Sequence, residues 1–291
     1  MSAQDQALAA RLARLSPGWR SDLIFPAFDG VVAERGEALV VRTPSNPHYY
    51  WGNFMLYERA PRAGELAAWV AAFEHEVHGV QPSSRHIALG LDGVASFELP
   101  DEPAAQGFEC HAATVLTMRR EQLTPQPEAP RLDGARIGSL EPRGYAAAVE
   151  LQCLCSEADG EGFEPALFRD FRERQMARYA AMNRAGRGDW FGVFAPGDRL
   201  LAECGLFTDA TGRIGRFQHV DTHPDWRRRG LCRALMHAVA RHGFERLGVD
   251  ELVIVADPDD VAIGLYESLG FRRGATTWQL QRRAPVDMTS R

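Results

Sequence analysis

The sequence lacks three features that would place a chain of 291 residues in other classes of protein. It has no apolar run of the roughly 20 residues that a bilayer-spanning helix needs. It has no excess of basic charge, because its net charge is −6, and this argues against a general nucleic-acid binder. It has only five cysteines, and Cys153-x-Cys155 has neither zinc-ligand spacing nor a second pair to complement it. We therefore expect no membrane partner, no nucleic-acid partner and no metal site.

The first residues also lack the apolar core that a signal peptide carries. Met1 to Leu15 mixes Gln, Asp, Ala, Arg and Leu, and this mixture predicts an amphipathic helix. The odd number of scattered cysteines fits reduced thiols better than a disulfide framework. These features predict a cytoplasmic protein.

The chain does contain a pattern for binding anions, which begins at Asp221. A predicted strand ends there, and a polar turn, three arginines, Gly230 and an amphipathic helix follow. The first N–H groups of a helix lack intrahelical acceptors, and the aligned peptide dipoles add roughly half a positive charge at that end. Such a helix start binds phosphate, and glycine lets the backbone approach the ligand closely. A P-loop and a dinucleotide fingerprint are excluded, because the Gly-Lys-Ser/Thr ending and further glycines are missing.

The run Arg227-Arg228-Arg229-Gly230-Leu231-Cys232 resembles the acyl-CoA pyrophosphate loop of the GNAT superfamily of acyltransferases, Gln/Arg-x-x-Gly-x-Gly/Ala. It departs from that pattern at Cys232, where Gly or Ala is usual. A second resemblance is to the family segment Asn-x-x-Ala-x-x-Leu-Tyr-x-x-Leu-Gly-Phe. Its matches are Asp259 (in place of Asn), Ala262, Leu265, Tyr266, Leu269, Gly270 and Phe271. The resemblance covers roughly residues 133–283, and it implies the α/β fold of this family, a mixed sheet with helices on both faces.

The order of predicted elements agrees with that architecture. Strands are predicted at 135–140, 190–195, 200–208, 213–222, 251–256 and 275–280, and helices at 144–154, at 165–182, after Gly230 and at 262–269. A stretch rich in Pro and polar residues precedes them and predicts a linker. We therefore expect a domain at 1–122, a linker at 123–132 and a catalytic domain at 133–291.

Residues 1–122 have a similar but less complete order of predicted strands and helices. Strands are predicted at 38–42, 49–57, 86–91 and 112–118, and a helix at 65–77. A Gly-Phe step, a later threonine and a closing arginine pair recur at one spacing in both halves. They are Gly107-Phe108, Thr114 and Arg119-Arg120, and then Gly270-Phe271, Thr277 and Arg282-Arg283. This favours two GNAT-like units in tandem, of which the first is degenerate, because its segment 58–64 lacks the pyrophosphate-loop pattern.

The resemblance implies an N-acetyltransferase that moves acetyl from acetyl-CoA directly to a primary amine of a small molecule or peptide. It implies that pyrophosphate binds the amides from Arg228 to Arg233, and that pantetheine pairs with the strand backbone at His219 to Asp221. It also implies that Tyr266 is the general acid for the departing sulfur. The full set of expected cofactor contacts is His219, Val220, Asp221, Arg227, Arg228, Arg229, Gly230, Leu231, Cys232, Arg233, Asp259 and Tyr266.

The proton acceptor and the acyl acceptor stay open at this stage. Histidine side chains titrate near neutral pH, which makes His219 a candidate base, and Glu203 on the preceding strand is another. Tyr266 has the alternative of packing its ring without acting as an acid. The acidic connection 155–164 either lines the site of a cationic amine or is a solvated loop. A non-catalytic acyl-CoA-binding sensor and an acyltransferase with a non-amine acceptor remain as alternative functions, and the chain is expected to be a monomer or a homodimer.

Overall fold

The computed structural model describes residues 3–126, 133–140 and 144–284, and it divides into two compact units. The first unit comprises Met1–Val115, Val255–Pro258 and Gly274–Arg291, and the second comprises Leu116–Ile254 and Asp259–Arg273. The main boundaries fall within two long strands, β5 (Phe108–Arg119) and β11 (Arg272–Arg282), so each of these strands contributes residues to both units. Of the predicted linker at 123–132, residues 127–132 lie outside the described part of the chain.

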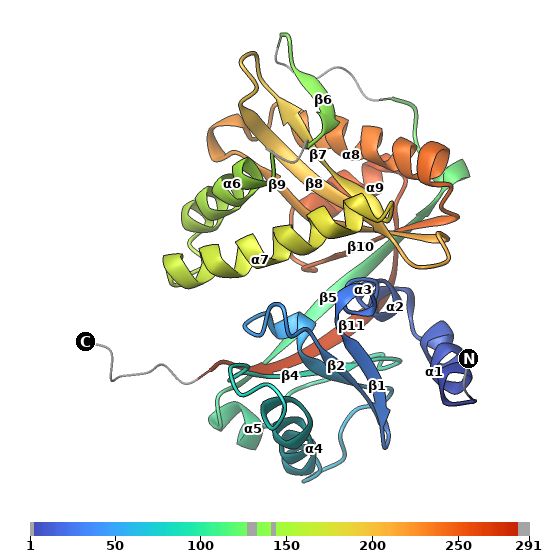
Figure 1. The fold of residues 1–291 in the computed structure, drawn as a ribbon, viewed down its shortest axis with the longest axis vertical. Coiled ribbons are helices and arrows are strands. Elements are labelled where there is room, and N and C mark those ends of the chain that lie inside the picture. Colours follow the sequence, from blue (N-terminus) through green and yellow to red (C-terminus); the bar gives the residue numbers. More distant parts are fainter. Residues whose placement is uncertain (1–2, 127–132, 141–143, 285–291) are drawn as a thin grey trace. The chain divides into compact units, whose positions relative to one another are not determined.

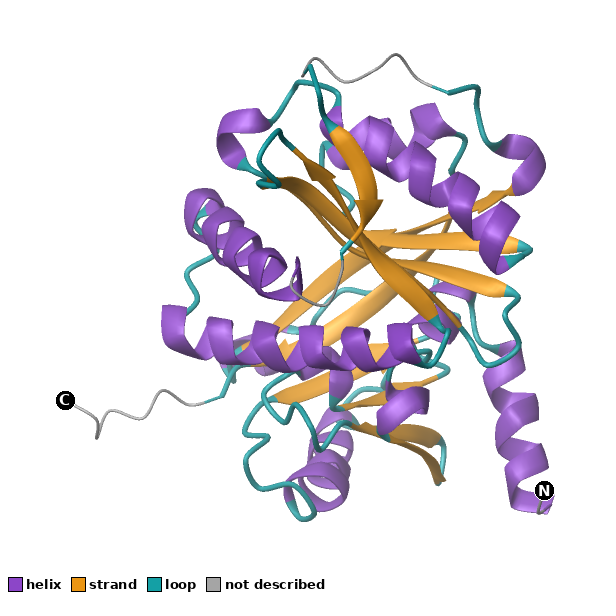
Figure 2. Cartoon of the chain, turned by 45° about the horizontal axis from the view of Figure 1, so that its top comes forward, coloured by secondary structure: helices purple, strands orange, loops and turns teal. Residues whose placement is uncertain are grey.

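The second unit has a mixed sheet, as predicted (Figure 1). Strands β6 (Arg136–Ser139), β7 (Gly188–Phe194), β8 (Leu200–Thr208) and β9 (Ile214–Thr222) are antiparallel neighbours, and β10 (Glu251–Ala256) runs parallel to β9. Helices α6 (Gly144–Asp159) and α7 (Pro165–Arg184) pack together on one face. Helices α8 (Leu231–His242) and α9 (Ala262–Leu269) pack on the other (Figure 2).

The centre of this unit is an aromatic stack under α7. Tyr179 of α7 lies 4.8 Å from the ring of Trp190 and 5.0 Å from that of Phe207, measured between ring centroids. A Cβ at Gly205 would lie 2.6 Å from the Trp190 ring, so only glycine leaves room for the indole. All nine residues of β8 are buried, as expected for a strand that is covered on both faces.

The first unit contains two short helical segments and a helix before its sheet, namely α2 (Pro17–Asp22), α3 (Pro26–Asp29) and α1 (Ala3–Arg14). Strands β1 (Val31–Arg35), β2 (Ala38–Arg42) and β3 (Phe54–Tyr57) are antiparallel, and β4 (Ile87–Leu91) runs parallel to β3. Helix α4 (Leu66–Phe73) joins β3 to β4, and α5 (Asp101–Ala105) follows β4. The last residues of β11, Trp278 to Arg282, pair antiparallel with β4, and β5 is the neighbour of β11 on its other side.

Two tryptophans cover the two faces of the first sheet. Trp19 of α2 donates its indole N–H to the carbonyl of Leu91 at 3.0 Å and is 1% exposed. Trp69 of α4 stacks on Tyr57 with ring centroids 3.6 Å apart. Successive side chains of a strand point to opposite faces, so the core of this unit lies on both sides of β3 and β4.

The element order of the two units is the same over a long stretch. Each has three antiparallel strands, a helix, a five-residue π turn, a strand parallel to the third, a short helix and a long strand. The π turns are η2 (Glu74–His78) after α4 and η5 (Gly243–Leu247) after α8. Among the described helices, none has the length and apolar character that crossing a bilayer requires.

Most predicted elements are confirmed, but in the first unit α2, α3 and β1 were not predicted, and one predicted strand is too long. Strand β1 was not expected, because Ala-Glu-Arg in its second half has no apolar alternation. The expected strand at 49–57 begins only at Phe54, after a 3-10 turn at Tyr50–Gly52. The cause is Asn53, whose side chain accepts from the Thr43 amide and donates to the carbonyl of Asn46, and so closes a loop.

Candidate active site

The helix start that the sequence predicts as an anion site has the expected backbone. Gly230 is the N-cap residue of α8 with φ 79°, a left-handed conformation that favours glycine. Arg228, Arg229 and Gly230 are exposed, whereas Leu231 is 1% exposed and anchors the first turn in the core. The Arg229 guanidinium lies 4.4 Å over the Trp226 ring. The first N–H groups of α8 therefore follow directly after an exposed, basic turn.

Arg227 makes contacts inside the protein that the sequence did not predict. Its guanidinium makes two hydrogen bonds to Asp159, at 2.6 and 2.8 Å, and its Nε donates to the carbonyl of Thr222. The same ion pair lowers the pKa of Asp159. Arg227 thus ties the end of α6 to the loop before α8, and Arg228, Arg229 and Arg233 are the arginines left for a phosphate ligand.

The strands β9 and β10 pair over only a short distance. Their register pairs are Glu251 with Ile214, Leu252 with Gly215 and Val253 with Arg216, and the described strands make no pair beyond these. On its other side, β9 stays paired with β8 as far as Thr222. The edge of β9 from Phe217 onward is therefore open toward β10, and an extended ligand can add to it as a further strand does.

His219 is the extra residue of a β-bulge within that open stretch. Cys204 pairs with Val220 and Gly205 with Gln218, so His219 has no partner in β8. Its φ is 47°, which is uncommon for a residue other than glycine. The bulge turns the side chain of His219 toward that of Asp221.

Three polar side chains meet beside this bulge. Nε2 of His219 and Oδ2 of Asp221 lie 2.7 Å apart, close enough for an ion pair but not aligned as a hydrogen bond. Neither atom has a hydrogen-bond partner among the described residues. Glu203 completes the group, and one ligand atom from each side chain lies within 4.8 Å of the others. The structure thus brings together both candidate bases, Glu203 and His219, and two of the expected cofactor contacts, His219 and Asp221.

Glu203 is the most deeply buried member of this cluster, at 0% exposure. Its Oε1 accepts from Nε2 of Gln152 at 2.8 Å, and its Oε2 accepts from Nε1 of Trp190 at 3.0 Å. Burial raises the pKa of Glu203 well above its usual value, and the charge of Asp221 raises it further. Gln152 and Trp190 were missed as site residues. The available signal was a lone glutamine on the apolar face of α6, between Ala148 and Cys155.

Asp221 differs from Glu203 in the sign of its shift. Burial raises its pKa, but His219, Arg172 and Arg227 outweigh that effect, so the pKa lies below the usual value. The two neighbouring carboxyl groups therefore have opposite tendencies, one to hold a proton and the other to stay ionised. Such a pair, with an imidazole beside it, can bind a cation and move a proton.

Tyr266 projects from α9 and is 4% exposed. Burial raises its pKa far above 10, and the neighbouring Cys232, Asp260, Cys204 and Asp221 add to the rise. The phenol therefore keeps its proton at neutral pH and can only donate it. Cys232, at the small position of the phosphate loop, is a neighbour of Tyr266, and burial raises the pKa of its thiol to about 12.

Two observations concern the expected acidic residues. Asp259 is exposed in the turn before α9, and the side chain that accepts from the amide of Ala262, at the start of that helix, is Asp260, at 2.8 Å. Half of the connection at 155–164 belongs to α6, which ends at Asp159. Glu164 caps α7 by accepting from the amides of Ala166 and Leu167, so most of these carboxylates have partners inside the protein.

The cluster of Glu203, His219 and Asp221 also has the ligand types that a divalent metal accepts. Both oxygens of Glu203 already accept hydrogen bonds, and the positive charges of Arg172 and Arg227 act on Asp221. These donors and charges suit a bound proton or ammonium group better than a metal dication. An open strand edge, a basic helix start with a left-handed glycine and a buried acid–base cluster thus lie within one unit.

Two sequence comparisons relate this geometry to known proteins. Residues 150–271 match the model of the Acetyltransferase (GNAT) family. A mycothiol acetyltransferase from Thermobispora bispora is 32% identical over 229 residues, which cover 73% of this chain and 73% of that protein.

Solved structures share the fold at lower identity. A conserved protein of unknown function from Staphylococcus epidermidis has a TM-score of 0.68 at 11% identity, over 87% of this chain and 93% of that chain. A GCN5-related N-acetyltransferase from Kribbella flavida has a TM-score of 0.61 at 15% identity, over 98% and 97%. A tandem GNAT protein from the clavulanic acid biosynthesis pathway has a TM-score of 0.55 at 12% identity, over 98% and 97%. At these identities the likeness concerns the fold alone.

Proposed function

This chain belongs to the GNAT family of acetyltransferases, and from that premise we propose that it transfers acetyl from acetyl-CoA to a primary amine of a small molecule or peptide. The observation that carries the proposal is the open edge of β9 beyond Arg216, because it leads from the buried acid–base cluster to the start of α8. A pantetheine arm is amide-rich and extended, so it suits such an edge. A pyrophosphate suits the helix start.

The residues that would hold acetyl-CoA follow from these features. The amides from Arg228 to Arg233 bind the pyrophosphate, with the side chains of Arg228, Arg229 and Arg233 assisting. The backbone of His219, Val220 and Asp221 pairs with the pantetheine. Acetyl-CoA supplies an activated acetyl thioester, and the cytoplasm is the compartment in which we propose the chain works.

Proton transfers are assigned to three side chains. Asp221 attracts the acceptor as an ammonium ion, and His219 takes the proton that the ammonium must lose before its nitrogen lone pair can attack. Asp221 then stabilises the imidazolium, as the acid of a catalytic triad does. Tyr266 gives its proton to the sulfur that leaves when the C–S bond breaks, and it regains a proton from the nitrogen, which loses its second proton as the amide forms. Glu203 keeps its own proton beside His219 and Asp221, and it excludes water from the cluster.

The first unit is proposed to be a degenerate copy of the same unit, which makes the chain a tandem GNAT protein. The shared element order, with a π turn after the long helix in each unit, supports this. In the turn before α4, the Glu65 carboxylate accepts from the amide of Arg62 at 2.8 Å and pairs with Arg59 at 2.6 Å, so a negative charge already precedes this helix. Strands β3 and β4 stay paired to the last residue of each, Tyr57 with Leu91. We therefore propose one acetyl-CoA site per chain.

The test is a calorimetric titration with acetyl-CoA followed by an assay for released thiol with a panel of acceptors. The panel contains alkylamines, polyamines, amino-terminal peptides and, because of the relative from T. bispora, the substrate of that mycothiol acetyltransferase. One site per chain and amine-dependent thiol release are expected. Binding without release to any acceptor would favour an acyl-CoA sensor, and release only with thiols or alcohols would replace the amine.

Two further measurements test the assigned protons. Replacing His219 by Gln should remove the acidic limb of the pH–rate profile with little change in acetyl-CoA affinity. An unchanged acidic limb would transfer the role of base to another group. Removal of divalent metals by EDTA should leave turnover unchanged, and a loss restored by Zn²⁺ would mean that Glu203, His219 and Asp221 hold a metal.

A further inference from the structure

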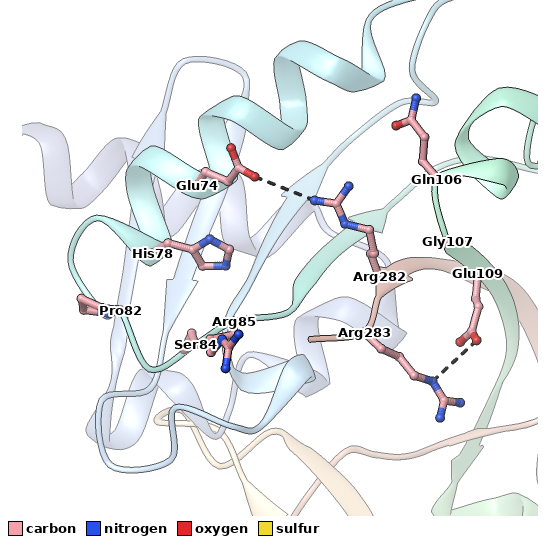
Figure 3. A pocket seen from close by; sticks show the side chains of 10 residues that line it. All are labelled: Glu74, His78, Pro82, Ser84, Arg85, Gln106, Gly107, Glu109, Arg282 and Arg283. Atoms are coloured by element: carbon pink, nitrogen blue, oxygen red, sulfur yellow. Dashed lines mark ion pairs between the residues drawn. The ribbon is translucent and has the colours of Figure 1, made fainter. Parts of the chain in front are cut away.

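The first unit contains a cavity of about 660 Å³ that has no part in the proposed acetyl transfer. It lies between the π turn η2, the loop before β4, the start of β5 and the end of β11 (Figure 3). Three guanidinium groups and two carboxylates line it, together with His78 and Gln106. They are Arg85, Arg282 and Arg283, and Glu74 and Glu109. Sites for small ligands have volumes of about 300–1,000 Å³, so this cavity is large enough for one.

Two of the arginines line the cavity with N–H groups that are not hydrogen-bonded to their glutamate partners. Arg282 lies 3.8 Å from Glu74 and Arg283 lies 3.5 Å from Glu109, which are ion-pair distances longer than hydrogen bonds (Figure 3). The Arg282 guanidinium is oriented by the Phe108 ring, 5.0 Å below it. Glu109 is meanwhile bound by the side chain of Gln281 at 3.1 Å, which lowers its pKa. The carboxylates thus fix the arginines in place without saturating them.

The matching arginine pair of the second unit has no such opening. Arg120 donates to the carbonyl of Phe244, in the π turn η5, and its guanidinium lies over the ring of that residue. Arg119 lies 3.9 Å from Glu251. The same sequence feature is therefore used for internal contacts in one unit and faces a cavity in the other.

A glycine beside each arginine pair accounts for the difference in the space around the two pairs. In the second unit the chain that follows β5 packs against Gly270, and a Cβ there would collide with the carbonyl of Gln122. In the first unit a Cβ at Gly107 would meet no heavy atom within 4 Å. The space that protein atoms fill beside Gly270 is thus open beside Gly107, which lines the cavity.

We propose that this cavity binds a small organic anion with several oxygens, a phosphate ester or a polycarboxylate. Planar guanidinium groups bind such oxygens in pairs, and the long ion-pair distances of Arg282 and Arg283 leave N–H donors for an anion. The site is separate from the phosphate-binding start of α8, which lies in the other unit. It is independent of the proposed acetyl transfer.

The test is a calorimetric titration of the full chain with inorganic phosphate and, separately, with citrate. We expect one of them to bind, and R282Q together with R283Q to weaken that binding at least 10-fold. The tighter of the two probes identifies the ligand as a phosphate ester or a polycarboxylate. Arg35→Gln is the matched control, because Arg35 is also an exposed arginine of the first unit that pairs with a glutamate, and it should bind as the wild type does.

Three outcomes overturn the proposal. They are absence of binding for both probes, equal binding by the double variant, and loss of binding in Gly230→Asp, which would assign the anion to α8. If the double variant does not fold, Arg283→Gln alone replaces it, since that side chain is 62% exposed. Acetyl-CoA affinity measured on the same samples separates failure of this site from failure of the proposed function.

Discussion

The two units share their order of elements but differ where the third strand of that order leads into the next helix. In the second unit, β9 leaves its parallel neighbour after three register pairs, and the next helix starts at a left-handed glycine. In the first unit, β3 stays paired to its end, and the next helix starts at Glu65, a residue in right-handed helical conformation. A fold depends on a distributed core, whereas a ligand site depends on a few backbone positions, so two units with one order of elements can differ in what they bind.

The two helix starts differ in the charges that precede them. An anion binds where the first N–H groups of a helix are free, and the turn before α8 is exposed and carries arginines. Among the described residues, no side chain caps the start of α4. The Glu65 carboxylate instead accepts from Arg59 and from the amide of Arg62, which precedes the helix, and these hydrogen bonds lower its pKa to about 2.

The largest effect is expected from Gly230→Asp. A side chain at φ 79° costs about 1–2 kcal/mol of strain, and two like charges about 4 Å apart at a protein surface repel by about 4 kcal/mol. Acetyl-CoA affinity should fall at least 100-fold in a calorimetric titration. Gly64→Asp is the matched control in the first unit, since Gly64 has φ 76° in open space before α4, and it should leave the affinity unchanged. Equal losses in both variants would show a general folding defect.

A smaller effect, on rate alone, is expected from Tyr266→Phe. Removing a general acid slows turnover by about 100-fold or more, while the remaining ring still packs against Phe271. The acetyl-CoA affinity should stay within about two-fold. Tyr145→Phe is the control. It makes the same chemical change at a half-buried tyrosine elsewhere in this unit, and burial raises the pKa of Tyr145 to about 12. Equal turnover of the two variants would remove the acid role from Tyr266.

A pH-dependent effect on stability is expected from Glu203→Gln. Because burial raises the pKa of Glu203 above 4.5, the folded state holds a proton that the unfolded state has released. Wild-type stability therefore falls as pH rises from 4.5 toward the folded pKa, by at most about 1.4 kcal/mol per pH unit. Over this pH range, the free energy of unfolding of the variant, measured by urea titration, should rise relative to that of the wild type. Glu150→Gln, at an exposed carboxylate whose pKa Arg169 lowers, should show no such gain.

The smallest effect is expected from Glu65→Gln in the first unit. The depressed pKa of Glu65 stabilises the fold above pH 4.5, and this contribution is lost as pH falls toward about 2. The variant should be less stable than the wild type at neutral pH and should approach it in acid. It should not gain a second acetyl-CoA site, because β3 and β4 remain paired. A titration with two sites would show that Glu65 alone had closed the first unit.

Local patterns predicted the parts of the molecule that depend on neighbouring residues. Strands β8 and β10 and the helix start at Gly230 have the predicted bounds, because their apolar runs and turn residues are contiguous. The environment of Glu203 was out of reach, since its donors Gln152 and Trp190 come from a helix and another strand. So was the ion pair of Arg227, because an arginine beside a phosphate-binding loop and one paired with Asp159 look alike in sequence.

The closing strand of the chain has a consequence for the order of synthesis. Residues Trp278 to Arg282 form the edge partner of β4, although β4 is made almost two hundred residues earlier. Until residues 278–282 have left the ribosome, Ile87, Leu89 and Leu91 belong to a strand without this neighbour, and an open apolar edge can pair with other chains. The first unit to be translated is therefore the last that can be completed. A fragment that ends at residue 122 should aggregate where the whole chain does not.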